Sequence, residues 1–227
     1  EDIADKLSFP KSKIHVVYLA ASTSFKKIDD QKFLNEVSDK YKLPKKFALY
    51  VGDVNWHKNI ENMLKAVKIA DCDLVMVGKA LADDNIPQTR EINSFIGKLG
   101  LRKQIIKTGF IEEDDLAAIY NLAKLTLLPS YYEGFGLPVL ESMACGTPIV
   151  ASNISSIPEI SKDNIFFCDP ADPQDIAKKI KEVFGLSPRK LDGLSQKLIG
   201  ESKKYFWHRV AAETANIYRS VINFRGL

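Results

Sequence analysis

Short apolar runs alternate along this chain with segments in which apolar residues recur every three or four positions. The first pattern predicts buried strands, and the second predicts amphipathic helices. The predicted strands are Ile14–Tyr18, Phe47–Val51, Leu74–Val77, Ile105–Thr108, Leu125–Leu128, Ile149–Ala151 and Ile165–Phe167. The predicted helices are Asp29–Tyr41, Ile60–Ala70, Gln88–Leu99, Glu112–Ala123, Leu137–Cys145, Asp172–Phe184, Pro188–Lys203 and Trp207–Asn223.

Strands that are apolar throughout and alternate with helices predict a parallel sheet that is covered on both faces. The expected fold class is therefore α/β, with a Rossmann-like, doubly wound parallel sheet. Ligands of such sheets bind at the carboxyl ends of the strands, so the loops after Val51, Val77, Thr108, Leu128 and Ala151 matter most. The first strand is not followed by G-x-G-x-x-G, which disfavours a NAD-dependent dehydrogenase.

Composition narrows the class of protein without identifying it. The 227 residues are 45% hydrophobic and 27% charged with a net charge of +3, which excludes disordered and collagen-like chains and predicts no nucleic-acid partner. No apolar run approaches the roughly 20 residues of a membrane span. Cys72, Cys145 and Cys168 lie far apart, so we expect no disulfide framework and no metal site. Their distribution fits a reducing cytoplasm.

The segment most suggestive of chemistry follows the predicted strand that ends at Leu128. It reads Pro129-Ser-Tyr-Tyr-Glu-Gly-Phe-Gly-Leu-Pro-Val-Leu-Glu141. Gly134 and Gly136 make the backbone of this turn more flexible. Pro138 occupies what we expect to be the first position of a helix. A glycine-rich turn at a helix N-terminus offers backbone N–H groups and a positive dipole end to an anion. A diphosphate is the natural ligand, although a plain strand-to-helix turn would have the same pattern.

Two carboxylates favour a more specific ligand. Glu133 lies in the loop, and Glu141 lies about one turn into the helix. A carboxylate beside a phosphate site is electrostatically unfavourable unless it accepts hydrogen bonds from neutral hydroxyl groups. Sugars and ribose supply neighbouring hydroxyls, and an acidic residue near a strand end is a known partner of ribose. The loop therefore indicates a nucleotide-sugar site, with solvated carboxylates as the alternative.

These residues resemble a known family. Glu133 and Glu141, with seven residues between them, match the E-x7-E pattern of retaining glycosyltransferases with the GT-B fold. The surrounding run up to Ser152 looks like the signature of family-4 glycosyltransferases. Val51-Gly52 through His57-Lys58-Asn59 looks like the family's first phosphate-binding loop, and the similarity extends over nearly the whole chain.

The resemblance implies catalytic roles for two residues. Glu133 would hold hydroxyls of the donor sugar, and Lys58 would neutralise the diphosphate. A lysine at a helix N-terminus is mildly unfavourable unless an anion shares the site, which favours the same role for Lys58. Glu141 would accept hydrogen bonds from the ribose. The other expected binding residues are Gly52, His57, Phe110, Gly134, Phe135, Gly136 and Leu137.

Several of these assignments leave alternatives open. Phe110, like its neighbour Ile111, either frames the base or belongs to the core. Many family members carry Arg directly after the glycine of the first loop, whereas this chain has Asp53. His57 either replaces part of that charge when it is protonated, which a diphosphate would favour, or has a structural role.

The resemblance also predicts how the chain is organised. We expect residues 1–12 to end an interdomain connection, residues 13–204 to form the nucleotide-sugar-binding domain, and residues 205–227 to form a helix that packs on an absent N-terminal domain. The chain begins without Met and looks like part of a longer protein. The missing half would bind a carbohydrate or lipid-linked acceptor. We expect a cytoplasmic protein, with the full-length form peripherally associated with the inner face of the membrane as one alternative.

The expected activity is transfer of a hexosyl group, of mannosyl or glucosyl type, from GDP-mannose or a UDP-hexose to an acceptor hydroxyl. No further cofactor and no metal are expected. The pathway would be polysaccharide or glycolipid synthesis, and the isolated chain would bind donor weakly without turnover. Two alternatives are a non-catalytic nucleotide-sugar-binding module and a GT-B sugar-nucleotide epimerase, which shares the fold but not usually the E-x7-E pattern.

Overall fold

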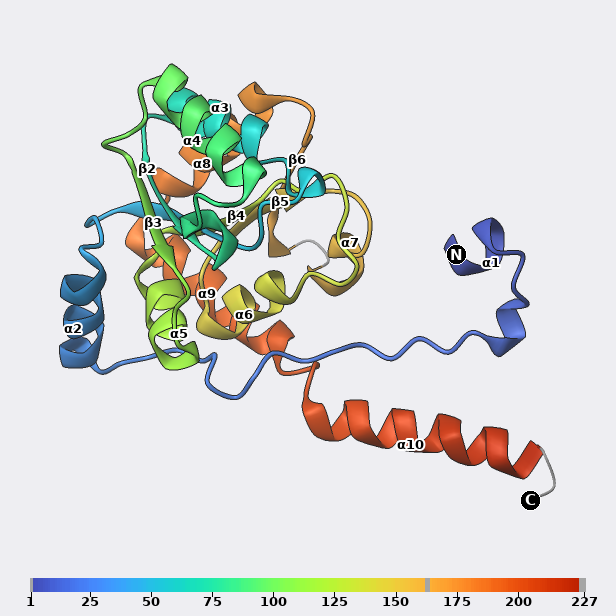
Figure 1. The fold of residues 1–227 in the computed structure, drawn as a ribbon. Coiled ribbons are helices and arrows are strands. Elements are labelled where there is room, and N and C mark those ends of the chain that lie inside the picture. Colours follow the sequence, from blue (N-terminus) through green and yellow to red (C-terminus); the bar gives the residue numbers. More distant parts are fainter. Residues whose placement is uncertain (1, 162–163, 225–227) are drawn as a thin grey trace. The chain divides into compact units, whose positions relative to one another are not determined.

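One six-stranded parallel sheet forms the centre of the structure, which is a computed structural model that describes residues 2–161 and 164–224. The strands are β1 (Phe47–Val51), β2 (Asp73–Val77), β3 (Ile105–Gly109), β4 (Leu125–Leu128), β5 (Ile149–Ser152) and β6 (Phe166–Cys168). Their order is β3-β2-β1-β4-β5-β6, and every pair is parallel (Figure 1). This order is that of a doubly wound Rossmann-like sheet, so the predicted fold class is confirmed.

Helices cover both faces of the sheet (Figure 1). On one face lie α3 (Ile60–Ala70), α4 (Pro87–Leu99) and α8 (Pro173–Phe184). On the other face lie α2 (Gln31–Tyr41), α5 (Glu113–Leu122), α6 (Leu137–Cys145) and α9 (Pro188–Ser202). The strands between them are buried on both sides, and Leu49, Leu74 and Leu125 have no exposed surface. Burial on both faces explains why these strands consist mainly of apolar residues rather than alternating apolar and polar ones.

Local signals account for the ends of several helices. The Asp30 carboxylate accepts hydrogen bonds from the backbone N–H groups of Lys32 and Phe33, which caps the start of α2. Gly100 and Gly146 have φ values of 74° and 72° and end α4 and α6 in the left-handed conformation that glycine adopts without strain. Most helices and strands begin and end within two residues of their predicted bounds.

Two features differ from the prediction. Ile14–Tyr18 is irregular rather than a strand, and Val16 is 69% exposed. A strand needs a neighbour for its backbone hydrogen bonds, and Ile14–Tyr18 belongs to the compact unit outside the sheet, in which no described residue forms a strand. A short helix that the pattern did not reveal, α7 (Ile157–Ser161), follows β5. Its five residues are too few to show a helical period.

The chain separates into two compact units. Residues 21–203 form the first, which contains the whole sheet. The second consists of the segments before and after it, with helices α1 (Asp2–Lys6) and α10 (Trp207–Phe224). Within this second unit the rings of Tyr18 and Tyr205 meet edge to face at 6.0 Å between centroids. Residues 1 and 225–227, which belong to the predicted terminal segments, lie outside the described residues.

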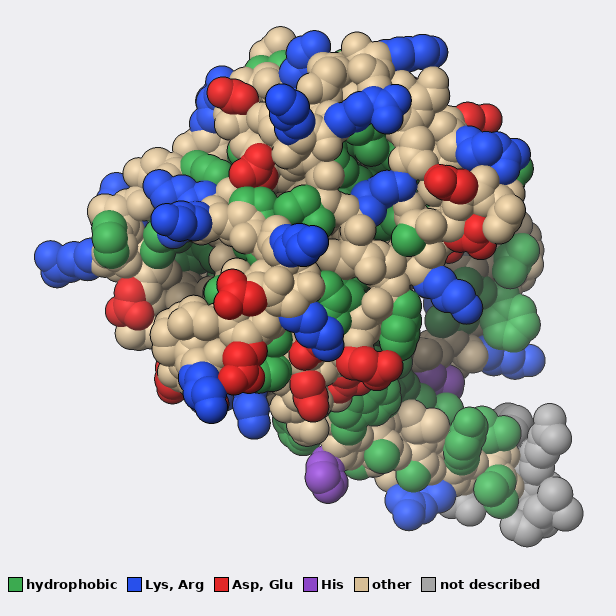
Figure 2. All heavy atoms as spheres, turned by 60° about the vertical axis from the view of Figure 1, so that its left-hand side comes forward, with side chains coloured by type: hydrophobic (Ala, Val, Ile, Leu, Met, Phe, Trp, Pro, Cys, Tyr) green, Lys and Arg blue, Asp and Glu red, His purple; other side chains and the backbone are tan. Residues whose placement is uncertain are grey.

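The surface carries charges of both signs. Figure 2 shows Lys and Arg side chains interspersed with Asp and Glu on the face in view. This mixing matches the small net charge of +3. Within the part of the chain that the structure describes, no helix is both long enough and apolar enough to span a bilayer.

Candidate functional site

The site lies where the strand order of the sheet reverses direction. β1 and β4 are neighbours, and the chain runs outward from them to opposite edges of the sheet. At such a switch point the loops at the carboxyl ends of the strands separate and leave a crevice for a ligand. Here these loops are residues 52–59 after β1 and residues 129–136 after β4. The two segments that the sequence singled out are thus brought together.

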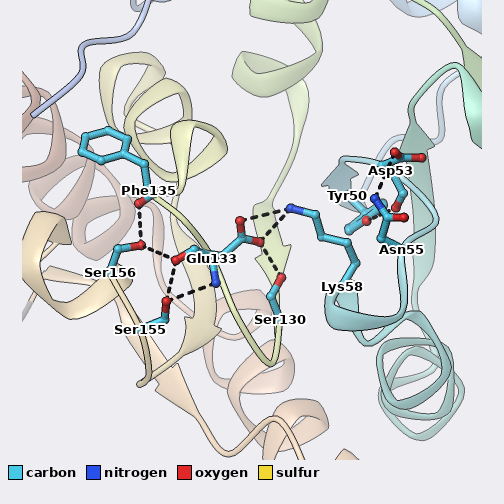
Figure 3. A network of polar contacts seen from close by, with 9 residues as sticks. All are labelled: Tyr50, Asp53, Asn55, Lys58, Ser130, Glu133, Phe135, Ser155 and Ser156. Atoms are coloured by element: carbon cyan, nitrogen blue, oxygen red, sulfur yellow. Dashed lines mark hydrogen bonds and ion pairs between the residues drawn. The ribbon is translucent and has the colours of Figure 1, made fainter. Parts of the chain in front are cut away.

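An ion pair joins the two loops. The Nζ of Lys58 lies 2.9 Å from Oε1 and 3.0 Å from Oε2 of Glu133, so the ammonium faces both carboxylate oxygens (Figure 3). Lys58 comes from the short helix η2 (Trp56–Lys58) and is 14% exposed, whereas Glu133 is 7% exposed. A carboxylate with so little access to water needs such partners, because an unpaired buried charge is costly. The pair keeps the site neutral while it holds both groups in place.

Serine residues fix the position of Glu133. The buried hydroxyl of Ser130 donates to Glu133 Oε1 at 2.7 Å. From the loop after β5, the Ser155 hydroxyl contacts both the N–H and the carbonyl oxygen of Glu133. The Ser156 hydroxyl lies within hydrogen-bond distance of the carbonyl oxygens of Glu133 and Phe135, at 3.0 and 2.9 Å (Figure 3). Ser155 and Ser156 could not be recognised from the sequence, because only the order β4-β5 places the two loops side by side.

Asn59 ties the first loop to its neighbours. It is buried and left-handed, with φ of 55°, and its Nδ2 donates to the carbonyl oxygens of Pro129 at 2.8 Å and Pro170 at 2.6 Å. A further hydrogen bond runs from the N–H of Tyr131 to the carbonyl oxygen of His57 at 2.7 Å. The His57 backbone thus supports the second loop, while its ring meets that of Trp56 edge to face.

The N-terminus of α6 opens beside Glu133. Gly136 precedes the helix with φ of 97°, and Leu137 begins it, so Pro138 is the second helical residue rather than the predicted first. The first N–H groups of a helix lack acceptors within the helix and give its end a partial positive charge. The first turn of α6 contains no acidic residue that would occupy this end. Gly134 through Leu137 therefore lie at a helix N-terminus that is open to an anion, and their role in binding stays a prediction.

Glu141 lies apart from this network. It is half-buried in α6, and its Oε2 accepts a hydrogen bond from the hydroxyl of Tyr120 at 2.7 Å. Burial raises the pKa of Glu141, and the nearby charge of Glu113 raises it further, against the lowering effect of the Tyr120 hydrogen bond. Burial also raises the pKa of Tyr120 far above its usual value, so this hydroxyl remains a donor. Tyr120 is a further residue that the sequence pattern did not point to.

A cleft of about 550 Å³ lies at the ends of β1, β2 and β3. Gly52, Gly78 and Gly109 line it together with Phe110, which is 68% exposed. Exposure of Phe110 excludes the alternative that it belongs to the core. A Cβ atom on Gly78 would lie 2.0 Å from the carbonyl oxygen of Gly52, so the two loops can approach this closely only without a side chain.

Asp53 stands where the resemblance led us to look for an arginine. Its carboxylate turns back onto its own loop, where it accepts from the N–H of Val54 at 2.7 Å and the Nδ2 of Asn55 at 3.2 Å (Figure 3). The hydroxyl of Tyr50 donates to the Asp53 carbonyl oxygen at 2.6 Å. Asp53 thus shapes the loop that carries Lys58. Among the described residues, no group of three or more His, Cys, Asp or Glu side chains is placed to hold a metal ion.

Comparison with known proteins assigns the chain to a group of enzymes. The family described as "Glycosyl transferases group 1" matches residues 31–199. The serotype-specific mannosyltransferase WbdA of Escherichia coli is 33% identical over 215 residues, which cover 93% of this chain and 26% of the relative. O-antigen chain mannosyltransferase B of Escherichia coli is 30% identical over 96% of this chain and 57% of its own length. The chain therefore spans about a quarter to three fifths of these curated relatives.

Solved structures agree with this match. A glycosyltransferase from Rickettsia africae has a TM-score of 0.87 at 19% identity, covering 97% of this chain and 60% of that one. Alr3699/HepE of Anabaena, solved in complex with UDP-glucose, has a TM-score of 0.77 at 19% identity, covering 92% of this chain and 57% of that one. At these identities the likeness shows a common fold.

Proposed function

Because the chain belongs to the glycosyl transferases of group 1, we propose that it is the donor-binding domain of a retaining family-4 glycosyltransferase. The fold is that of GT-B glycosyltransferases. The proposed reaction moves a hexosyl group from a nucleoside diphosphate sugar to an acceptor hydroxyl. The observation that carries the proposal is the Lys58–Glu133 pair, which lies at the switch point of the sheet beside the N-terminus of α6.

The pair supplies a cation for the diphosphate of a nucleotide sugar and a carboxylate for the hydroxyls of its sugar. A diphosphate would attract the Lys58 ammonium and the N–H groups at the start of α6. Glu133 would then exchange its bonds with Lys58 for hydrogen bonds from hydroxyls of the donor sugar. Negative charge builds on the leaving diphosphate as the glycosidic bond breaks. Lys58 and the end of α6 would stabilise that charge without reorganisation, because the surrounding hydrogen bonds already hold them in place.

The nucleoside would occupy the neighbouring surface. Glu141 would accept hydrogen bonds from the ribose hydroxyls, while Tyr120 keeps its carboxylate oriented. The cleft bordered by Gly52 and Phe110 would hold the base. This arrangement divides the two carboxylates into a sugar-side residue, Glu133, and a ribose-side residue, Glu141.

The relatives support a hexosyl donor. WbdA and O-antigen chain mannosyltransferase B are named as mannosyltransferases, and Alr3699/HepE was solved with UDP-glucose. GDP-mannose and UDP-hexoses are therefore the proposed donors, in polysaccharide or glycolipid synthesis. The acceptor, carbohydrate or lipid-linked, would bind a further domain, and the cytoplasm or the inner face of the membrane is the proposed location.

A calorimetric screen of UDP, GDP and ADP sugars against this chain tests the proposal. We expect at least one UDP or GDP sugar to bind, and Lys58→Ala and Glu141→Ala each to weaken binding about tenfold, the equivalent of one charged hydrogen bond. Lys32→Ala, which removes an exposed lysine of α2, is the matched control and should bind like the parent. Parental affinity in both site variants would contradict the assignment. With donor and acceptor present, the chain alone should give no transfer.

A further inference from the structure

A second concave surface lies beside the candidate site. It is a groove of about 320 Å³ between η2, the first turns of α3, one face of α4 and the loop after β4. Three aromatic residues line it, namely Trp56, Phe95 and Tyr131. Trp56 and Tyr131 each stand two residues before a member of the Lys58–Glu133 pair, so the same two loops build both the candidate site and this groove.

The aromatic rings are accessible although their backbone is held firmly. The indole of Trp56 is 80% exposed, and Tyr131 is 38% exposed. The N–H of Tyr131 donates to the carbonyl oxygen of His57 at 2.7 Å, and its hydroxyl accepts from Nδ2 of Asn62 at 2.9 Å. A large apolar ring that is both exposed and fixed is already ordered for contact, so a ligand that packs on it would lose little entropy.

The polar groups of the groove exclude an anionic ligand. Asn55 and Gln88 contribute amides, and Glu61 and Glu91 contribute carboxylates, whereas no Lys or Arg is among the described residues that line the groove. The ammonium of Lys65 borders the groove, at 3.2 Å from Oδ1 of Asn62 and 5.8 Å from the centroid of the Phe95 ring, and its single positive charge is outnumbered by the two carboxylates. Two negative charges without a lining cation repel phosphate and carboxylate groups.

Neutral pyranose rings have the complementary chemistry. A pyranose presents apolar C–H groups that pack on an aromatic face, while its hydroxyls donate to carboxylates and exchange hydrogen bonds with amides. We propose that this groove binds a neutral pyranose unit of the acceptor glycan, remote from the part of the acceptor that the further domain would hold. The identification of that glycan as the acceptor rests on the proposed function, but the complementarity of the groove to a neutral oligosaccharide does not.

Tryptophan fluorescence offers a direct test. The chain has two tryptophans, Trp56 and Trp207, so Trp207→Phe leaves Trp56 as the single reporter. We expect a saturable change of its emission on titration with α-linked mannotetraose or maltotetraose. Tyr131→Ala in the same background should weaken tetrasaccharide binding about tenfold. Tyr218→Ala, which removes an exposed aromatic ring of α10 outside the groove, is the control and should leave the affinity unchanged.

Further variants separate loss of contact from loss of structure. Gln88→Ala and Glu91→Ala change exposed residues of α4 and do not disturb the loop of Tyr131, and each should weaken tetrasaccharide binding. Calorimetry with UDP and GDP sugars runs in parallel. If nucleotide sugars bind but neither tetrasaccharide does, the groove proposal is overturned and the proposed function stands. If a tetrasaccharide binds but nucleotide sugars do not, the groove stands and the proposed function fails.

Discussion

Among single residues, Lys58 and Glu133 have the strongest mutual dependence. Removing only Lys58 would leave a carboxylate of 7% exposure without its cation, and breaking a buried pair costs about 3–5 kcal/mol. The Ser130 hydrogen bond remains and places the expected loss at the lower end of this range. Lys58→Met should therefore lower the free energy of unfolding by about 3 kcal/mol. Chemical denaturation of this chain measures the effect.

The double variant Lys58→Met, Glu133→Gln is the control for that measurement. It removes both charges, so no unpaired carboxylate stays buried. We expect it to be more stable than Lys58→Met alone by at least about 1 kcal/mol, because residues in direct contact are not additive. Equal stability of the single and double variants would show that the pair is not coupled.

The carboxylate of Glu141 should affect both the pH dependence of folding stability and the affinity for the nucleotide. Burial raises its pKa above the ordinary value of 4.5, so between 4.5 and the raised pKa the folded chain binds more protons than the unfolded chain. Its contribution to the free energy of unfolding therefore falls as the pH rises through this window. Glu141→Gln keeps an acceptor for Tyr120 and lacks this charge, so it should be more stable than the parent above the window.

Unfolding of the parent and of Glu141→Gln at a series of pH values tests this expectation. The stability gained by the variant should grow from near zero well below pH 4.5 to a plateau above the raised pKa of Glu141. The same variant should bind the nucleotide less tightly, since a neutral amide is a weaker acceptor for hydroxyls than a carboxylate. A variant that is less stable at neutral pH would refute the role given to burial.

At the scale of elements, the close approach of the loops after β1 and β2 depends on glycine. Gly78→Ala would place a Cβ atom 2.0 Å from the backbone oxygen of Gly52, a contact that only a backbone shift relieves. We expect a loss of about 1–3 kcal/mol. Gly193→Ala in α9 meets no atom within 4 Å and should instead raise stability by about 0.5–1 kcal/mol. Thermal unfolding measures the melting temperatures of both variants. Similar melting temperatures for Gly78→Ala and Gly193→Ala would contradict the expected difference.

The elements were predictable where burial determines the sequence pattern. Phe47–Val51 and Leu125–Leu128 consist mainly of apolar residues because helices cover both faces of the sheet, so their bounds follow from the sequence. Ile14–Tyr18 has the same pattern but no neighbour in the sheet, and a strand does not form without one. The order β3-β2-β1-β4-β5-β6 is a property of tertiary packing that periodicity does not encode.

The sequence predicts part of the candidate site. Its loop, both carboxylates and Lys58 follow from local patterns and from the family resemblance. Ser155, Ser156 and Tyr120 do not, because their partners lie 22, 23 and 21 residues away along the chain and meet only in the folded sheet. Their contribution is to orient side chains that motifs identify, and the roles of those side chains in binding remain predictions.

At the scale of the whole molecule, the chain divides into two units of unequal content. Every residue assigned to the candidate site and to the adjoining groove lies within residues 21–203. This unit holds the complete sheet with its helices on both faces, which is the organisation that allows a domain of this size to bury its own core.

We therefore predict that residues 21–203, expressed alone, unfold in a single cooperative transition and bind the same nucleotide sugar as the whole chain. The affinity should agree within about threefold, a difference of about 0.6 kcal/mol. Calorimetry on both chains measures the affinity, and denaturant unfolding reports cooperativity. A folded unit that no longer binds would show that the terminal segments contribute to the site. A unit that fails to fold would show that the sheet depends on α10 or on the segment before Ala21 for its stability.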